Sequence, residues 1–228
     1  MSDSDIADTI SAYGRSAANA KKVGFDAIAI HGGHGYLIDA FLWEGSNQRK
    51  DDWGGNIKNR MKYGVEVIKA IKAEVNDLLP IIFRFSQWKQ SDFSAQIAYN
   101  PSQLEQILGT FSDAGVDAFD ASSRHYEEPA FPDFDMHLSL AGLAKKLTNK
   151  PAMAVGGIGL KEDIYESMRS GGSEASNNIV EVAERVSRGE FDFACVGRAL
   201  LSEPNWPKKI LRGEECKPFK IDDLAEMI

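Results

Sequence analysis

The sequence predicts an α/β fold built from parallel βα units. Two observations support this prediction: apolar runs of strand length alternate with helical patterns along the chain, and the junction between them repeats. A glycine that suits a helix C-terminus stands just before a strand start at 24–26, 115–117 and 189–192. The loops that follow the strands in such units gather at one end of the sheet, so functional residues are expected there.

The composition is that of a globular protein with one sizeable core. The chain has 228 residues, 43% hydrophobic and 26% charged, and we expect a single domain over residues 1–228. The formal charge of -8 argues against a nucleic-acid or anionic-membrane partner. The acidic start lacks a signal core and no apolar run could cross a bilayer, so a cytoplasmic location is expected. Cys195 and Cys216 lack a CxxC spacing and are expected to be free thiols.

The first half of the chain is predicted to alternate helix and strand. Apolar or small residues at helical spacing fill 6–22 behind Ser and Asp caps, and the apolar run 25–30 follows as a buried strand. A short helix is expected at 37–42. The segment 46–55 is too long and too rich in charge for a plain connector, so we interpret it as a lid or binding loop. A helix at 56–75 follows it.

The second half continues this pattern with two long loops. The strand 80–85 is followed by a loop at 86–100, and the strand 116–121 by a loop at 122–136. Pro101 opens the helix between them, and Gly115 closes it. Further strands are expected at 152–155 and 191–196, with helical segments at 138–147, 164–168 and 178–188 and a last helix that opens at 203–206.

The loop at 31–36 carries the strongest sign of chemistry. It holds His31, His34 and Tyr36 on a glycine-rich backbone that can turn tightly, directly after a predicted strand. Neutral imidazole nitrogens can hold a carbonyl-type oxygen, and a nearby phenol can give up a proton. The alternative interpretation is a turn in which the histidines are ordinary polar loop residues.

Further candidate residues belong to the later strands and their loops. Arg84 interrupts an apolar strand, and a core accepts an arginine only beside an anion or a polar ligand. Gly156 and Gly157 follow the fourth strand, and Gly197 and Arg198 follow the fifth. Bare backbone N–H groups together with an arginine suit a phosphate, so these residues predict a cofactor or a phosphorylated substrate. An ordinary turn with a helix-capping arginine is the alternative.

His31 and His34 are three residues apart and could instead be metal ligands. This interpretation is less favoured, because a metal site needs a third protein ligand and the nearby carboxylates, Asp39 and Glu44, have no diagnostic spacing. No metal site is therefore predicted. A metal-dependent lyase or aldolase that uses the two histidines is the alternative enzyme class.

Five longer stretches carry motifs of one known family. They lie at 24–42, 46–60, 83–86, 154–158 and 196–204, and together they extend over nearly the whole chain. These motifs resemble the old yellow enzyme family of FMN-dependent ene-reductases, and most closely a bacterial branch of NADH:flavin oxidoreductases. The chain thus looks like an NAD(P)H:flavin oxidoreductase.

The resemblance implies a reaction and a role for each candidate residue. His31 and His34 would hydrogen-bond the carbonyl or nitro oxygen of an activated alkene, and Tyr36 would protonate its α-carbon. Arg84 would lie against N1 and the C2 oxygen of the flavin. The family passes a hydride from NADH or NADPH through FMN to the β-carbon of a small-molecule substrate. The FMN phosphate would be held by Gly156, Gly157, Gly197 and Arg198.

The resemblance also implies a (β/α)8 TIM barrel, which needs eight strands. Only about five βα units are predicted here, so we expect a partial barrel that runs from the helix before strand four to the helix after strand eight. Two strand edges would then be unpaired. A missing N-terminal segment or a homo-oligomeric partner is expected to complete the barrel. The alternative function is an incomplete barrel with weak or no flavin binding that self-associates or binds a partner.

Overall fold

The computed structural model describes residues 1–134 and 137–227. The last two residues of the predicted loop 122–136 lie outside this range. The described helices are α1 (Asp3–Val23), α2 (Leu37–Leu42), α3 (Ile57–Val75), α4 (Pro101–Ala114), α5 (Leu140–Thr148), α6 (Ile164–Ser170), α7 (Ile179–Ser187), α8 (Ala199–Ser202) and α9 (Trp206–Arg212), with 3-10 turns at Pro132–Phe134 and Ile221–Met227. The strands are β1 (Ile28–His31), β2 (Ile81–Phe85), β3 (Ala118–Ser122), β4 (Ala152–Val155), β5 (Gly172–Ser173), β6 (Phe193–Cys195) and β7 (Phe219–Lys220).

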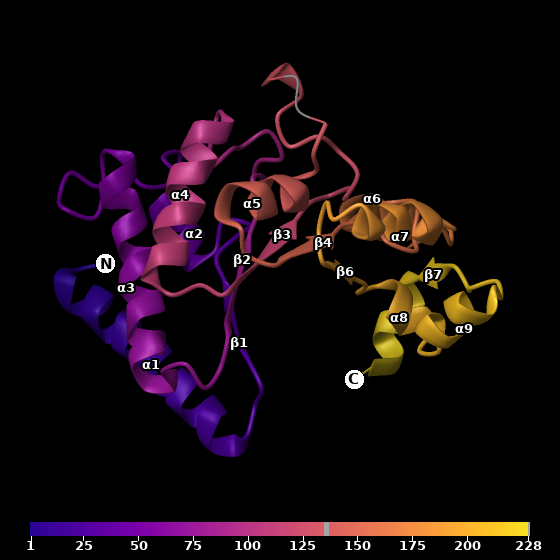
Figure 1. Ribbon diagram of the computed structural model, residues 1–228, viewed down its shortest axis with the longest axis horizontal. Coiled ribbons are helices and arrows are strands. Elements are labelled where there is room, and N and C mark those ends of the chain that lie inside the picture. The colour runs from indigo at the N-terminus through magenta and orange to yellow at the C-terminus, as the bar shows by residue number, and fades with distance from the viewer. Residues whose placement is uncertain (135–136, 228) are drawn as a thin grey trace.

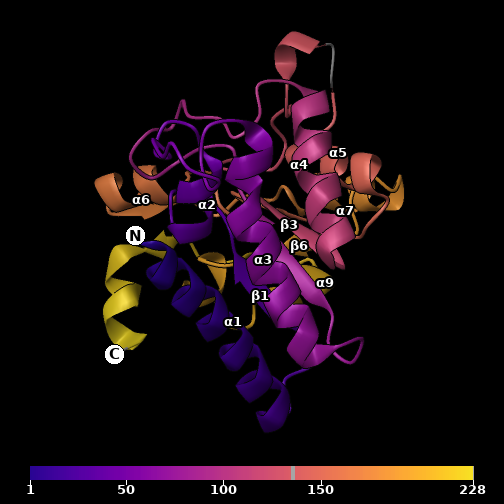
Figure 2. The ribbon, with the colours of Figure 1, turned by 90° about the vertical axis from the view of Figure 1, so that its left-hand side faces the viewer.

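Five of the strands form one parallel sheet in the order β1-β2-β3-β4-β6, so each main strand pairs with the next one along the chain. Helices α3, α4 and α5 lie along one side of this sheet (Figure 1). Figure 2 shows α1 and α3 side by side on the same outer layer. β5 and β7 make a separate antiparallel pair. The five predicted βα units are confirmed, and the open sheet is a partial barrel.

The two faces of the sheet have different surroundings. One face carries apolar residues that are fully buried under the helices, such as Phe83 and Phe119. The opposite face carries one register row that crosses all five strands and consists of His31, Arg84, Asp120, Met153 and Phe193. Phe193, at the β6 edge of that row, is 53% exposed. We call this side the open face, and it corresponds to the interior of the barrel that five strands do not close.

The helix boundaries follow the capping residues in the sequence. Ser2 accepts a hydrogen bond from the backbone of Asp5 in a capping box, and Gly24 ends α1 in the left-handed conformation. Asn100 caps α4, whose first residue is Pro101. These signals explain why the long helices begin and end within a few residues of the predicted positions.

Four of the five predicted strands are longer than the observed ones, and the difference is largest for β1 and β6. β1 begins at Ile28 because the predicted start, Phe25, is 63% exposed and has no strand partner. β6 likewise covers only 193–195 of the predicted 191–196. The β5–β7 pair was not predicted, since two-residue strands carry no periodic signal. None of the helices in residues 1–134 and 137–227 is both long enough and apolar enough to cross a membrane.

Candidate active site

The loop after β1, residues 31–36, brings three ring side chains together, and we call it the His–Tyr loop. The ring centroid of His31 lies 5.2 Å from that of His34 and 5.0 Å from that of Tyr36. The backbone reaches this arrangement through a left-handed residue, with φ of 61° at His34. Gly32 allows a close packing, since a Cβ there would lie 2.2 Å from a buried phenylalanine ring of β2.

His34 is held among groups that keep its imidazole uncharged. Its Nε2 lies 2.9 Å from the Oγ of Ser122 at the end of β3, and its ring centroid lies 4.4 Å from that of Trp88. Burial, together with the positive charges of His31 and Arg84, lowers the pKa of His34 to about 4. Burial and Arg84 also lower the pKa of His31. Both rings are therefore neutral at pH 7, and each can donate one N–H to an oxygen atom.

Tyr36 stands at the edge of this group. It is the residue before the first turn of α2, and its side chain is 51% exposed. Its hydroxyl oxygen accepts a hydrogen bond of 3.2 Å from Nε2 of Gln90. Because the oxygen acts as acceptor in this contact, the phenolic proton is available for another molecule.

Arg84 meets its anion within the sheet. Its Nε and Nη2 donate to the same oxygen of Asp120 on β3, at 2.8 Å and 2.6 Å. The sequence predicted an anion or polar ligand beside Arg84, and it did not identify Asp120. The other carboxylate oxygen of Asp120 is buried and has no partner among the described residues. The pair thus leaves one acceptor and an incompletely buried guanidinium on the open face.

One cavity of about 520 Å³ joins His34 to the predicted phosphate-binding residues. Its wall includes Gly156, Gly157, Gly197 and Arg198 at the ends of β4 and β6. The structure therefore brings five of the eight candidate residues to one cavity. His31, Tyr36 and Arg84 lie outside its lining, on the His–Tyr loop and the open face.

The backbone at the ends of β4 and β6 suits an anion. Gly156 and Gly157 have φ of 133° and 71°, and a Cβ on Gly156 would lie 2.5 Å from the carbonyl oxygen of Ser123. The backbone N–H groups of Gly156, Gly157, Gly197 and Arg198 donate to no other described residue outside regular secondary structure. Four such donors beside one cavity can bind the oxygens of a phosphate.

The guanidinium of Arg198 is fixed by its neighbours. Nη2 donates to the carbonyl oxygen of Glu162 at 2.7 Å, and Nη1 donates to that of Asp163 at 2.9 Å and to the hydroxyl of Ser167. Burial lowers the pKa of Arg198, while the charges of the two acidic residues raise it. An arginine held in this way keeps a positive charge at the cavity wall in one position.

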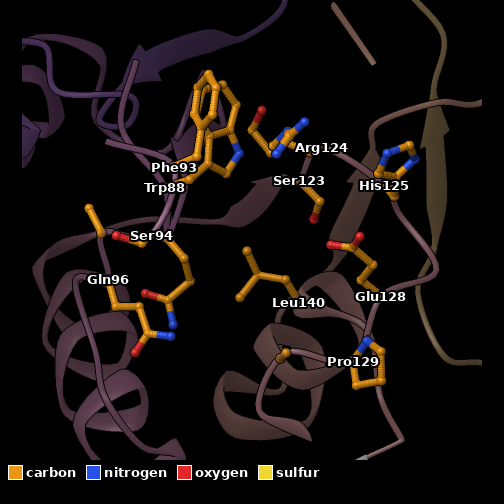
Figure 3. A pocket seen from close by; sticks show the side chains of 14 residues that line it. Trp88, Phe93, Ser94, Gln96, Ser123, Arg124, His125, Glu128, Pro129 and Leu140 are labelled. Atoms are coloured by element: carbon orange, nitrogen blue, oxygen red, sulfur yellow. The ribbon is translucent and has the colours of Figure 1, made fainter. Parts of the chain in front are cut away.

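A second cavity of about 420 Å³ opens beside the first one and shares Trp88, Ser122, Ser123 and Arg124 with it. Figure 3 shows Trp88 and Phe93 on one wall, across from His125 and Glu128. Arg124 lies over the ring of Phe93 at 4.8 Å and forms an ion pair with Asp163.

One group of possible metal ligands occurs among the described residues, and it consists of His125, Asp163 and Glu166. It contains neither His31 nor His34. Asp163 already pairs with Arg124 and caps the first turn of α6, so its carboxylate is engaged. The geometry of the two candidate histidines therefore gives no support to the metal-dependent alternative.

Comparison with known proteins identifies the family of the chain. Residues 1–216 match the model of the NADH:flavin oxidoreductase / NADH oxidase family. The chain is 32% identical over 218 residues to an NADH oxidase of Thermoanaerobacter brockii, covering 92% of the chain and 30% of that protein. It is 31% identical over 226 residues to an NADPH dehydrogenase of Clostridium acetobutylicum, covering 97% of the chain and 58% of that protein.

Two solved structures share the fold. The old yellow enzyme homologue of Zymomonas mobilis has a TM-score of 0.71 at 19% identity, with 98% of this chain and 56% of that chain covered. Morphinone reductase in complex with tetrahydroNAD has a TM-score of 0.73 at 18% identity, with 98% and 53% covered. The chain thus spans little more than half of each neighbour, as expected for a partial barrel. Its fold is that of these old yellow enzyme structures, and the match over residues 1–216 shows that the chain belongs to the NADH:flavin oxidoreductase / NADH oxidase family.

Proposed function

We propose that this chain supplies the reacting end of an FMN-dependent oxidoreductase that passes a hydride from NADH or NADPH to an activated alkene of the enone or nitro type. The observation that carries the proposal is the cavity that joins His34 to the free N–H groups of the loops after β4 and β6. This arrangement offers oxygen-binding donors at one end and a phosphate site at the other.

The residues that line the cavity at the ends of β4 and β6 fit a bound FMN. Gly156, Gly157, Gly197 and Arg198 would hold its phosphate through backbone N–H groups and a fixed positive charge. Arg84 would hold the pyrimidine side of the ring from the open face. When bound, FMN accepts a hydride from the nicotinamide and delivers a hydride to the alkene.

The chain's own side chains would then act on the substrate oxygen and on a proton. Neutral His31 and His34 each donate an N–H to the carbonyl or nitro oxygen, which stabilises the negative charge that develops there. Tyr36 lies 5.0 Å from His31, ring to ring, and donates its phenolic proton to the α-carbon. The sum of these steps adds one hydride and one proton across the double bond.

The open face indicates that further residues complete the site. His31 and Phe193 lie at its two edges and are exposed in this chain. We propose that three further βα units, or a second copy of the chain, cover this face and enclose the flavin ring. A small-molecule substrate would enter from the loop end, beside the His–Tyr loop.

The Tyr36→Phe substitution in the FMN-loaded enzyme tests the reaction. We expect alkene reduction to slow by about 10²- to 10⁴-fold, since the proton donor is lost, while reduction of the flavin by NADH or NADPH stays unchanged. The two half-reactions are followed separately by stopped-flow absorbance. Tyr99→Phe is the matched control, because Tyr99 is 50% exposed and its hydroxyl contacts Glu44. Equal loss in both half-reactions would contradict the proton-donor role.

A second candidate function is an assembly module with little or no flavin binding. The observation that favours it is the unpaired outer edge of β6, where a large apolar side chain is exposed. FMN binding by the chain separates this candidate from the first.

A further inference from the structure

We propose that the segment 86–90, which follows β2, is a positioning element that holds the His–Tyr loop in its reactive conformation. The proposal deepens the proposed function and rests on it for the roles of His34 and Tyr36. Four of the five residues in this segment contact the His–Tyr loop or its anchor, Asp39, each through a different group. We call this segment the positioning segment.

The first contacts involve the backbone and ring of His34. Ser86 Oγ accepts a hydrogen bond of 2.8 Å from the His34 N–H and donates one of 2.9 Å to the carbonyl oxygen of Trp88. The Trp88 ring then lies against the imidazole of His34. Gln90 N–H donates to the His34 carbonyl oxygen at 3.3 Å, and a parallel bridge links His34 to Lys89. The left-handed His34 is therefore bound on both sides of its backbone and at its ring.

The second contact is a buried ion pair. Lys89 Nζ lies 2.9 Å from Asp39 Oδ2, and both side chains are 0% exposed. The same carboxylate oxygen accepts a hydrogen bond of 2.6 Å from the N–H of Gly35, inside the His–Tyr loop. The ammonium also donates to the carbonyl oxygen of Gln87 at 2.9 Å. The charge of Lys89 thus fixes a carboxylate that in turn fixes the loop.

The third contact reaches Tyr36. Nε2 of Gln90 donates to its hydroxyl oxygen at 3.2 Å. This bond holds the phenol beside His31 and leaves the phenolic proton free for transfer.

The ion pair is better explained by positioning than by stability. Burial removes much of the hydration of both charges. Apolar residues of similar volume can therefore often replace such pairs at no loss of stability. Asp39 Oδ1 has no hydrogen-bond partner among the described residues, so one buried acceptor of the pair is unpaired. The ion pair supplies an acceptor for the Gly35 N–H in a fixed place, and an apolar pair cannot supply one.

The double variant Lys89→Met with Asp39→Leu tests the proposal in the full chain. We expect the melting temperature to stay equal or rise, because the apolar pair fills the same space. We expect amide exchange of Gly35 to speed up by about tenfold or more, as one hydrogen bond is lost. We expect the pKa of His34 to move toward its ordinary value, because the loop opens to water and because the positive charge of Lys89, which helps to lower this pKa, is removed. Both are measured by NMR. Lys72→Met, which breaks a surface ion pair with Asp77, is the control and changes neither.

Two results would overturn the proposal. One is a folded double variant in which the Gly35 exchange rate and the His34 titration are those of the wild type. The other is a double variant that does not fold, which would show that the pair supports the fold itself. Ser86→Ala provides a second test, and we expect faster exchange of the His34 N–H in a folded protein; unchanged exchange would count against the positioning segment. These measurements need neither FMN nor an alkene, so their outcome is independent of the Tyr36→Phe experiment.

Discussion

His34 owes its properties to residues that are distant in the sequence. Its ring contacts Trp88 after β2 and Ser122 at the end of β3, and the pKa is lowered to about 4 chiefly by burial. A neutral imidazole at this position can bind a substrate oxygen, and a charged imidazole would repel Arg84 on the open face. We therefore expect substrate binding to weaken when His34 becomes protonated at low pH.

The His34 pKa gives a pH dependence with a definite sign. The folded protein holds His34 neutral down to a pKa of about 4, whereas the unfolded chain protonates it near the ordinary histidine pKa of 6.5. Between these two pKa values the unfolded state binds more protons than the folded state. The contribution of His34 to the free energy of unfolding is therefore fully present above pH 6.5, and it falls as the pH drops, by up to about 1.4 kcal/mol per pH unit. We expect His34→Gln to reduce this dependence in urea unfolding at a series of pH values and to leave only the part due to His31, whose pKa is also lowered. An NMR titration of His34 with a midpoint near 6.5 would contradict the account.

At the residue scale the sequence points to the candidate groups of the His–Tyr loop but not to their partners in the fold. His31, His34 and Tyr36 could be identified because they follow a strand on a glycine-rich loop. Asp120 and Gln90 could not, because their contacts depend on which strands are neighbours and on the register between them. The parallel register of β2 and β3 is the signal that pairs Arg84 with Asp120, and it becomes visible only in the fold.

At the scale of elements, α6 is anchored to the cavity wall by Asp163. Its Oδ1 accepts the N–H groups of Tyr165 and Glu166 at the start of the helix, and its other oxygen pairs with Arg124. Burial raises the pKa of Asp163, but these hydrogen bonds and the positive charge outweigh it, and the pKa lies below its ordinary value. One carboxylate thus links the helix, the loop after β3 and the phosphate-binding end of the cavity.

The substitution Asp163→Ala measures this link. We expect the free energy of unfolding to fall by about 2–3 kcal/mol, since the helix cap and a buried ion-pair partner are lost together. Asp163→Asn keeps the helix cap, so we expect a smaller decrease in the free energy of unfolding. Both are measured by urea unfolding followed by circular dichroism. An alanine variant as stable as the wild type would show that α6 does not depend on this carboxylate.

The helices that are bounded by proline or glycine in the sequence were predicted best. Pro101 and Gly115 bound α4, and Gly24 ends α1, because proline and glycine have few or special backbone conformations. The edge strands β1 and β6 are shorter than predicted, since each has a sheet neighbour on one side and an exposed face. Apolar residues such as Phe25 and Phe193 therefore stay exposed although the pattern predicts burial.

At the scale of the molecule, the sheet has one covered face and one open face. The parallel βα pattern was predictable, because it depends on local periodicity and on chain connectivity, whereas the partial barrel was implied by the resemblance to the family. We propose that the barrel is closed by strands beyond these five, either from further βα units or from a second copy of the chain. The chain carries the loops proposed to bind the phosphate as well as the His–Tyr loop, so we expect it to bind FMN chiefly through the phosphate end.

The most direct test of the central claim is the affinity of the purified chain for FMN compared with riboflavin, measured by flavin fluorescence. Because riboflavin lacks the phosphate, we expect it to bind at least about tenfold more weakly than FMN. The Arg198→Ala variant should weaken FMN binding toward the riboflavin level, whereas Arg212→Ala, at an exposed position on α9, should leave it unchanged. A chain that binds no FMN, or binds FMN and riboflavin equally, would contradict the phosphate site and favour the assembly module.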